Sequence, residues 1–177
     1  MCGIYGIIKP GGDEILTSIA NSMRDAIHHR GPDNAGLYRE PGLVLGNNRL
    51  SIVDLSGGNQ PIFNEDRTLI IVYNGEIYNH IELRGDLEKK GHLFKTDSDT
   101  ETVLHAFEEY GPHCLERFNG IFAFAVWNIR EKSLFLARDS LGVKPLYLAS
   151  MEGGLAFASE AKALLGLLPG GARPNWT

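Results

Sequence analysis

The chain begins with Met1-Cys2-Gly3-Ile4-Tyr5-Gly6-Ile7-Ile8 and reaches Pro10-Gly11-Gly12 soon after. The apolar run after Cys2 predicts a buried strand, and Pro-Gly-Gly predicts the turn that ends it. We therefore expect the Cys2 thiol at the head of a core strand. A cysteine near a terminus can also pack as a small hydrophobic residue. Once Met1 is removed, however, Cys2 carries a thiol nucleophile and a free α-amine able to act as its base.

Length and composition favour one acidic domain, with 177 residues and a formal net charge of -5. The negative charge argues against nucleic-acid binding. No run of eighteen apolar residues and no signal-peptide pattern occur, so we expect a cytoplasmic protein without membrane contact. Cys2 and Cys114 are the two cysteines, and the six histidines show no HxxxH or HExxH spacing. We therefore expect neither a disulfide framework nor a metal site.

Helical and strand patterns follow one another irregularly along the chain. Helices are predicted over residues 13–29, 79–90 and 160–165, and from a capping box at Ser98-Asp99-Thr100-Glu101 to Gly111-Pro112. Strands are predicted at 35–39, 43–53 and 68–73, with 121–127, 133–138, 146–149 and 155–158 as an antiparallel meander. This order predicts an α+β fold with two facing sheets and outer helices. Residues 1–168 form the predicted domain, and 169–177 the predicted linker.

Two polar segments next to predicted strands have both a structural and a functional interpretation. Arg49 is either a surface charge or a planar fork that grips a carboxylate. Asn74-Gly75 most often forms a tight turn. A side-chain amide followed by a glycine N–H also supplies two neighbouring donors for an oxyanion.

Two further segments lie at predicted helix ends. Asp97-Ser98-Asp99 precedes a helix, where a carboxylate is favoured by the helix dipole, yet two are more than a cap needs, and the extra one suits a ligand ammonium. Arg30-Gly31-Pro32-Asp33 reads first as a helix stop, and a mobile lid has the same pattern. A thiolate, two oxyanion donors, an arginine and a carboxylate together suit a free amino acid with a side-chain amide, such as glutamine.

The ordered motifs resemble those of the glutaminase domain of class II, N-terminal-nucleophile glutamine amidotransferases, in the asparagine synthetase branch. The matching segments are Met1-Cys2-Gly3-Ile4, His29-Arg30-Gly31-Pro32-Asp33, Arg49-Leu50-Ser51-Ile52-Val53-Asp54, Asn74-Gly75-Glu76-Ile77-Tyr78-Asn79, Ser98-Asp99 and the stretch from Ala137 to Tyr147. They run in order to Ser159-Glu160-Ala161-Lys162, so nearly the whole chain takes part in the resemblance.

The resemblance implies a four-layer αββα sandwich of two mostly antiparallel sheets and a thioester mechanism on Cys2. It implies that Asn74 and the Gly75 N–H form the oxyanion hole. Substrate-binding roles are implied for Arg49, on the α-carboxylate, and for Leu50, Ile52, Val53, Gly75, Glu76 and Asp99. Arg30, Gly31 and Pro32 are the implied lid loop.

The resemblance also implies a partner, because such chains usually continue into a synthetase domain that uses ATP and Mg²⁺ and carries an SGGxDS loop. The sequence reaches Thr177 without that loop, and Ser56-Gly57-Gly58-Asn59-Gln60 lacks its Asp and Ser. We expect no cofactor in this domain, a synthetase domain or subunit as ammonia acceptor, and a possible homodimer. Two alternatives stay open. One is a noncatalytic glutamine-binding or interaction module, and the other is a different N-terminal-nucleophile amidase, which has no need of both Arg49 and Asp99.

Overall fold

The strand that follows Cys2 lies in the middle of a five-stranded sheet. The computed structural model describes residues 1–9, 13–50 and 58–168. The sheet has the order β2-β3-β1-β9-β8, and its neighbouring strands pair antiparallel. Its strands are β1 (Gly3–Ile8), β2 (Asn34–Glu40), β3 (Leu43–Arg49), β8 (Tyr147–Met151) and β9 (Gly154–Ala158). β1 is buried from Gly3 to Ile7, which confirms the predicted core strand.

A second antiparallel sheet faces the first and has the order β4-β5-β6-β7. Its strands are β4 (Ile62–Phe63), β5 (Leu69–Ile77), β6 (Gly120–Asn128) and β7 (Ser133–Arg138). β6 alternates large and small apolar residues, and both of its faces are buried. Phe122, Phe124 and Val126 pack in the cluster that includes Val103 and Leu104 of α3 (Asp99–Tyr110). Ala123, Ala125 and Trp127 pack in the cluster between the two sheets, with Ile4 and Phe157 of the first.

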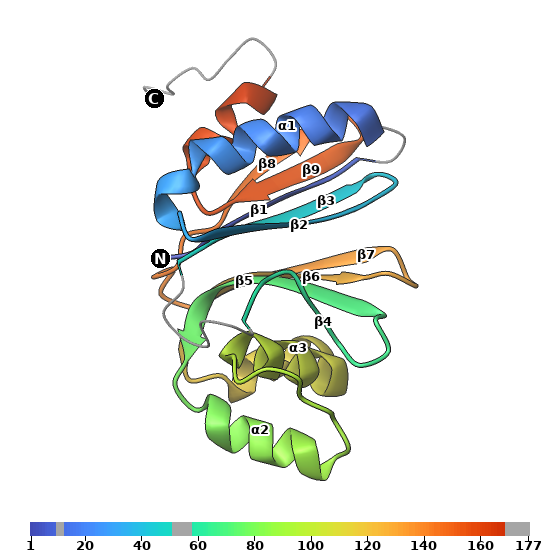
Figure 1. Cartoon of the computed structure of the whole chain (residues 1–177), viewed down its shortest axis with the longest axis vertical. Coiled ribbons are helices and arrows are strands. Elements are labelled where there is room, and N and C mark those ends of the chain that lie inside the picture. Colours follow the sequence, from blue (N-terminus) through green and yellow to red (C-terminus); the bar gives the residue numbers. More distant parts are fainter. Residues whose placement is uncertain (10–12, 51–57, 169–177) are drawn as a thin grey trace.

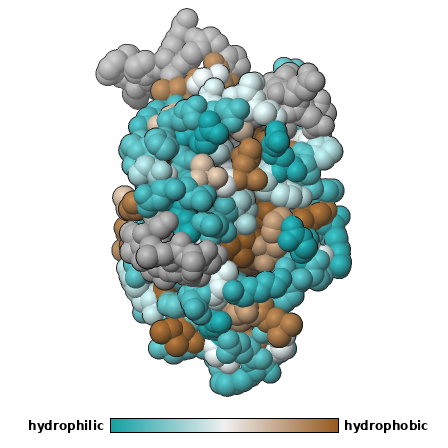
Figure 2. Space-filling model, in the orientation of Figure 1, coloured by the Kyte–Doolittle hydropathy of each residue, from teal (hydrophilic) through white to brown (hydrophobic). Residues whose placement is uncertain are grey.

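Helices cover the outer face of each sheet, as Figure 1 shows. α1 (Asp13–Ala26) lies on the first sheet, α3 lies on the second, and α2 (His80–Lys89) packs against the outer side of α3. Short 3-10 helices span His28–Arg30, Gly111–Arg117, Ala161–Ala163 and Leu165–Leu167. The surface over the helices is largely hydrophilic, and apolar atoms are visible about midway along the long axis (Figure 2). The α+β, four-layer αββα prediction is therefore confirmed.

Several predicted elements end differently in the structure. The helix predicted over 13–29 ends at Ala26, and that over 160–165 is a pair of 3-10 turns. The last four strands do not form one meander, because β6 and β7 belong to one sheet and β8 and β9 to the other. In place of a reciprocal capping box, Ser98 Oγ accepts from the Thr100 N–H and Glu101 binds the N–H groups of Lys95 and Thr96.

Two predictions fall wholly or partly on residues outside the described ranges. The stretch 169–177, predicted to be a linker, lies outside the described residues, as do residues 51–53 of the strand predicted over 43–53. Among the described residues, no helix is both long enough and apolar enough to cross a membrane.

Candidate active site

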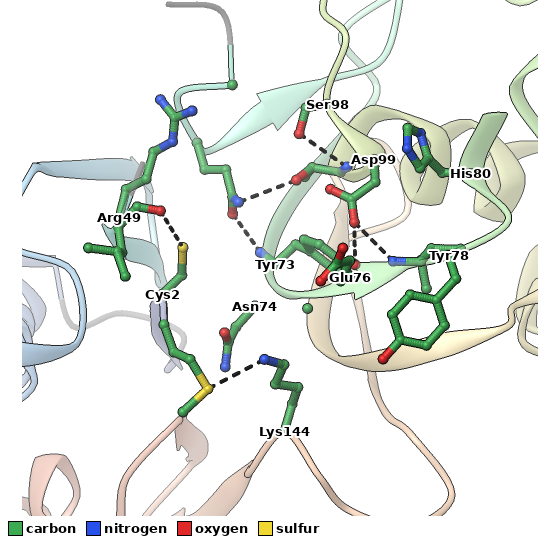
Figure 3. A pocket seen from close by; sticks show the side chains of 17 residues that line it. Cys2, Arg49, Tyr73, Asn74, Glu76, Tyr78, His80, Ser98, Asp99 and Lys144 are labelled. Atoms are coloured by element: carbon green, nitrogen blue, oxygen red, sulfur yellow. Dashed lines mark hydrogen bonds between the residues drawn. The ribbon is translucent and has the colours of Figure 1, made fainter. Parts of the chain in front are cut away.

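A cavity of about 330 Å³ brings residues of both sheets together with the first turn of α3 (Figure 3). The residues that line it are Met1, Cys2, Arg49, Leu50, Gly58, Gln60, Tyr73, Asn74, Gly75, Glu76, Ile77, Tyr78, His80, Ser98, Asp99, Thr100 and Lys144. Segments that the sequence analysis singled out separately, around Cys2, Arg49, Asn74 and Asp99, therefore share one space. In Figure 3, Cys2 and Asp99 lie on opposite sides of it, and Asn74 lies between them.

Cys2 lies directly before β1 and is half-buried. Its Sγ is 3.6 Å from the carbonyl oxygen of Leu50, which accepts the S–H bond. Met1 extends from it with 57% of its surface exposed, and its Sδ is 3.4 Å from Lys144 Nζ. While Met1 is present, the nitrogen of Cys2 is a peptide nitrogen, so it has no basic lone pair for the thiol.

Arg30 fixes the backbone of Cys2 from the 3-10 helix that follows α1. Its Nε donates to the Cys2 carbonyl at 3.0 Å, and its Nη1 lies 3.0 Å from Glu160 Oε1. His29 and Lys162 also contact the Glu160 carboxylate. Burial raises the pKa of Glu160, but hydrogen bonds from Arg30, Lys162 and His29 outweigh it and lower the pKa to about 2. A carboxylate that is ionised at neutral pH therefore orients Arg30.

The predicted lid residues are thus part of an ordered junction. The Arg30 side chain is 8% exposed, and Gly31 is buried against the backbone of Asn48 and Arg49, where no Cβ fits. Pro32 is exposed. A lid motion of this segment stays a prediction.

Asn74 and Gly75 lie within β5, opposite Ala123 and Phe122 of β6, so the tight-turn interpretation is wrong. Asn74 is 2% exposed, and its Nδ2 has no hydrogen-bond acceptor among the described residues. A buried amide without a partner carries a cost of about 1–3 kcal/mol, which an acceptor in the cavity would relieve. Figure 3 shows this amide in the space between Cys2 and Lys144.

The Gly75 N–H faces the same cavity. Backbone N–H groups along a strand alternate in direction, so those of Tyr73, Gly75 and Ile77 point to one edge. The Tyr73 N–H donates to Gln60 Oε1 at 2.6 Å, and the Ile77 N–H donates to Asp99 Oδ2 at 3.1 Å. Both acceptors line the cavity, so the Gly75 N–H between them is directed there too.

Asp99 is the carboxylate that the structure brings into the cavity, at the first residue of α3. Its Oδ2 accepts from Tyr73 Oη at 2.7 Å as well as from the Ile77 N–H. Burial raises the pKa of Asp99, and the two hydrogen bonds only partly offset this. A cationic ligand beside it would favour its ionised form. The Asp97 side chain, in contrast, is 93% exposed and lies 3.5 Å from Arg84 Nη1.

The remaining residues predicted to bind substrate either line the cavity or fall outside the described ranges. Arg49 is 5% exposed and ends β3 at the cavity, where its Nη1 donates to Asn59 Oδ1 at 2.7 Å. Leu50 and Glu76 also line the cavity, and Glu76 is exposed. Ile52 and Val53 lie outside the described residues.

Gln60 is a site residue that the sequence analysis missed. It is 8% exposed, its Oε1 accepts the Tyr73 N–H, and its Nε2 donates to Thr100 Oγ1 at 3.4 Å. It thereby joins β5 to the start of α3. Its position beside Pro61, after a glycine pair, reads locally as a loop, so only the folded structure reveals this role.

Lys144 is a second missed residue, and Asp139 positions it. The Asp139 carboxylate accepts three backbone N–H bonds, including that of Lys144 at 3.0 Å. Burial raises the pKa of Asp139, but these backbone bonds outweigh it and lower the pKa. Asp139 follows β7 directly and precedes Gly142, which has a φ of 66°. An acidic residue between a strand end and a glycine turn is the sequence signal for such a loop anchor.

Cys114 lies far from this chemistry, in the 3-10 helix Gly111–Arg117. It is fully buried in a cluster with Leu87 and Ala106, and burial raises the pKa of its thiol to about 12. It is therefore an inert structural cysteine.

Comparison with solved structures defines the class of fold. The chain superposes on the allosteric regulatory enzyme of purine biosynthesis with a TM-score of 0.77 and 23% identity, covering 92% of this chain and 43% of that one. It superposes on the glutamine phosphoribosylpyrophosphate amidotransferase from Bacillus subtilis with a TM-score of 0.76 and 21% identity, with the same coverage. The fold is that of N-terminal-nucleophile amidotransferases.

Sequence comparison then gives the family. The glutamine amidotransferase domain model matches residues 1–172, and the chain belongs to this family. Among its relatives are the asparagine synthetase [glutamine-hydrolyzing] 1 of Bacillus subtilis, 42% identical over 171 residues, and the probable asparagine synthetase of Dictyostelium discoideum, 43% identical over 167. The matches cover 93% of this chain but only 27% and 30% of those relatives.

Proposed function

We propose that this domain hydrolyses glutamine to glutamate and ammonia through a γ-glutamyl thioester on Cys2. The observation that carries the proposal is the shared cavity, where the thiol meets an unpartnered buried amide on Asn74 and the Gly75 N–H. Those two donors suit the oxyanion formed when a thiolate attacks an amide carbon. Attack forms the S–C bond, collapse expels ammonia, and water then releases glutamate from the thioester.

Removal of Met1 supplies the base in this scheme. The freed α-amine of Cys2 takes the thiol proton and later gives it to the leaving nitrogen. Met1 is 57% exposed, so an aminopeptidase can reach it, and the small Cys2 side chain suits such processing.

Two charged groups on opposite parts of the cavity wall suit the two ends of an α-amino acid. Arg49 would bind the α-carboxylate through its fork, and Asp99 would bind the α-ammonium, with Glu76 beside it. Leu50, Ile52 and Val53 would add backbone contacts. A ligand ammonium would also compensate the burial that raises the pKa of Asp99.

The acceptor of the ammonia is inferred from the relatives of this chain and not from the geometry of the cavity. The relatives that match are three to four times longer than this domain and are named for asparagine synthesis. We therefore infer that the ammonia serves a ligase-type amidation in asparagine biosynthesis, in a synthetase domain or subunit that uses ATP and Mg²⁺. This domain itself would need no cofactor for glutamine hydrolysis, and would work in the cytoplasm, with dimerisation possible and no nucleic acid or membrane as partner.

Two cysteine variants test the activity. Cys2→Ala removes the nucleophile and is expected to abolish glutamate release, while Cys114→Ser leaves the cavity unchanged and is expected to keep it, provided circular dichroism shows both folded. Glutamate release by Cys2→Ala at the wild-type rate would refute the thioester. Glutamine binding without turnover in fully processed wild-type protein would instead support the noncatalytic binding module.

A further inference from the structure

A cluster of two histidines and two glutamates lies on the outer side of the second sheet, separate from the active-site cavity. Glu65 comes from the loop between β4 and β5, His92 follows α2, and His105 and Glu108 lie one turn apart on α3. Each offers one ligand atom, and these atoms all lie within 4.8 Å of one another. Three segments distant in sequence therefore converge on one point.

The contacts within this cluster are long for hydrogen bonds between an imidazole and a carboxylate. His105 Nδ1 lies 3.4 Å from Glu65 Oε2 and 3.3 Å from Glu108 Oε2. His92 Nδ1 lies 3.3 Å from Glu65 Oε1 and 3.7 Å from Glu108 Oε2. Charge-assisted hydrogen bonds are shorter, about 2.7–2.9 Å. Ligands about 2.0–2.1 Å from a tetrahedral zinc ion stand about 3.3–3.4 Å apart, so an ion would draw the wider pairs of this cluster together.

The outward nitrogen of each imidazole faces another carboxylate. His92 Nε2 is 3.5 Å from Glu109 Oε2, and His105 Nε2 is 3.7 Å from Glu101 Oε1. His105 is fully buried, and its Nε2 has no hydrogen-bond partner within hydrogen-bonding distance among the described residues. Metal-bound histidines usually direct their second nitrogen at a carboxylate in this way.

One carboxylate oxygen of each glutamate also accepts a hydrogen bond from a residue outside the cluster. Glu65 Oε1 accepts the Leu93 N–H at 2.9 Å, and Glu108 Oε1 accepts from Asn64 Nδ2 at 2.8 Å. The second oxygen of each, Oε2, is the one that faces His105. The cluster is therefore ordered before any ion binds, which lowers the entropic cost of binding one.

We propose that Glu65, His92, His105 and Glu108 bind a divalent transition-metal ion, with zinc as the ion that fits best. Two imidazoles and two carboxylates that converge within 4.8 Å suit zinc or cobalt, whereas calcium and magnesium prefer oxygen ligands alone. The ion would be structural, because four protein ligands leave no position open for chemistry. The sequence analysis expected no metal, since the ligands are spread from residue 65 to 108 outside any short motif.

A proton is the competing occupant of this cluster. Burial lowers the pKa of His105, but the facing carboxylates of Glu101, Glu108 and Glu65 outweigh it and raise the pKa to about 9. Without metal, the cluster is thus an ion-pair network around a protonated imidazole. Direct measurement of metal binding separates the two.

The experiment titrates the chelator-treated full chain with Zn²⁺ and, separately, with Co²⁺. The Cys2→Ala variant serves as the parent protein, because the N-terminal thiol also binds soft metals. We expect one equivalent of zinc, a raised melting temperature with zinc, and the intense visible absorption of tetrahedral cobalt. His92→Gln and Glu108→Gln are each expected to weaken binding at least about tenfold. Both positions are partly accessible, so these variants are milder than a change at buried His105.

His113→Gln is the matched control, because His113 is 81% exposed, pairs with Glu116 and is not a member of the cluster. It is expected to bind zinc like the parent. Failure of the folded parent to bind an equivalent of either metal would overturn the proposal and leave the ion-pair network. Binding that survives unchanged in His92→Gln and Glu108→Gln would overturn it as well. Neither result bears on glutamine hydrolysis.

Discussion

Arg30 Nε donates a hydrogen bond to the carbonyl oxygen of Cys2 at 3.0 Å, across 28 residues of chain. Cys2 precedes β1 and lies outside the strand pairing that begins at Gly3, so its backbone needs a contact from another segment to hold it. Arg30, itself paired with Glu160, supplies that restraint next to the thiol. The junction between α1 and β2 therefore acts as a positioning element for the nucleophile.

The first prediction tests this restraint with Arg30→Lys. Lysine keeps the charge but lacks the planar fork that contacts Cys2 and Glu160 together. We expect kcat for glutamine hydrolysis to fall about 10–100-fold with little change in KM, because misplacing the nucleophile affects the reaction more than binding. Arg24→Lys is the control, since Arg24 pairs with Asp25 on the surface. Equal kinetics for the two variants would remove Arg30 from this role.

The second prediction concerns acid stability and uses Glu160→Gln. The pKa of Glu160 is about 2 in the folded protein, below its ordinary value of 4.5. A lowered folded pKa stabilises the protein above about pH 4.5, and this contribution disappears as the pH falls toward 2. Denaturant midpoints should therefore differ between wild type and variant at pH 7 and converge near pH 2–3. A gap that stays constant over this range would show that the charge of Glu160 is irrelevant.

The third prediction separates transition-state contacts from binding contacts. Asn74→Ala removes a donor aimed at the oxyanion, so kcat should fall about 100-fold or more while KM changes little. Asp99→Asn removes the counter-charge for the ammonium, so KM for glutamine should rise at least about tenfold. Steady-state kinetics on both variants decide the roles. Full turnover with poor affinity in Asn74→Ala would move Asn74 to the ground-state pocket.

The fourth prediction uses two glycines with opposite surroundings. A Cβ at Gly75 would lie 2.6 Å from the Ile121 carbonyl oxygen, whereas a Cβ at Gly85 in α2 meets nothing within 4 Å. Gly75→Ala should therefore destabilise the protein by about 1–3 kcal/mol by forcing β5 from β6. Gly85→Ala should stabilise it by about 0.5–1 kcal/mol through helix propensity. Urea denaturation measures the change in the free energy of unfolding for both variants. An unchanged value for Gly75→Ala would mean that β5 and β6 shift apart without cost.

Local sequence signals predicted the parts of the fold that depend on neighbouring residues. The apolar run Gly3–Ile8 is buried as β1, and Ser98 caps α3 as its residue type suggests. The layered architecture followed from strand groups and helix positions. These features depend on local periodicity and capping, which a single sequence displays.

Features that depend on contacts between segments far apart in the sequence could not be predicted from local patterns. Asn74-Gly75 is turn-like by composition, but pairing with Ala123 and Phe122 of β6 keeps both residues in β5. The last four strands divide between the sheets because β9 pairs with β1, which is about 150 positions earlier. His92 and His105 meet only because α3 folds back beside the segment after α2. No spacing rule within the chain encodes these contacts.

The most direct test of the account compares glutamine hydrolysis with the extent of Met1 removal. Samples with graded processing, quantified by intact mass, are assayed for glutamate release under identical conditions. Since the freed α-amine of Cys2 is the proposed base, the rate should rise in proportion to the processed fraction and approach zero when Met1 is fully retained. An undiminished rate in the fully Met1-retaining sample would contradict the account and show that another group serves as the base.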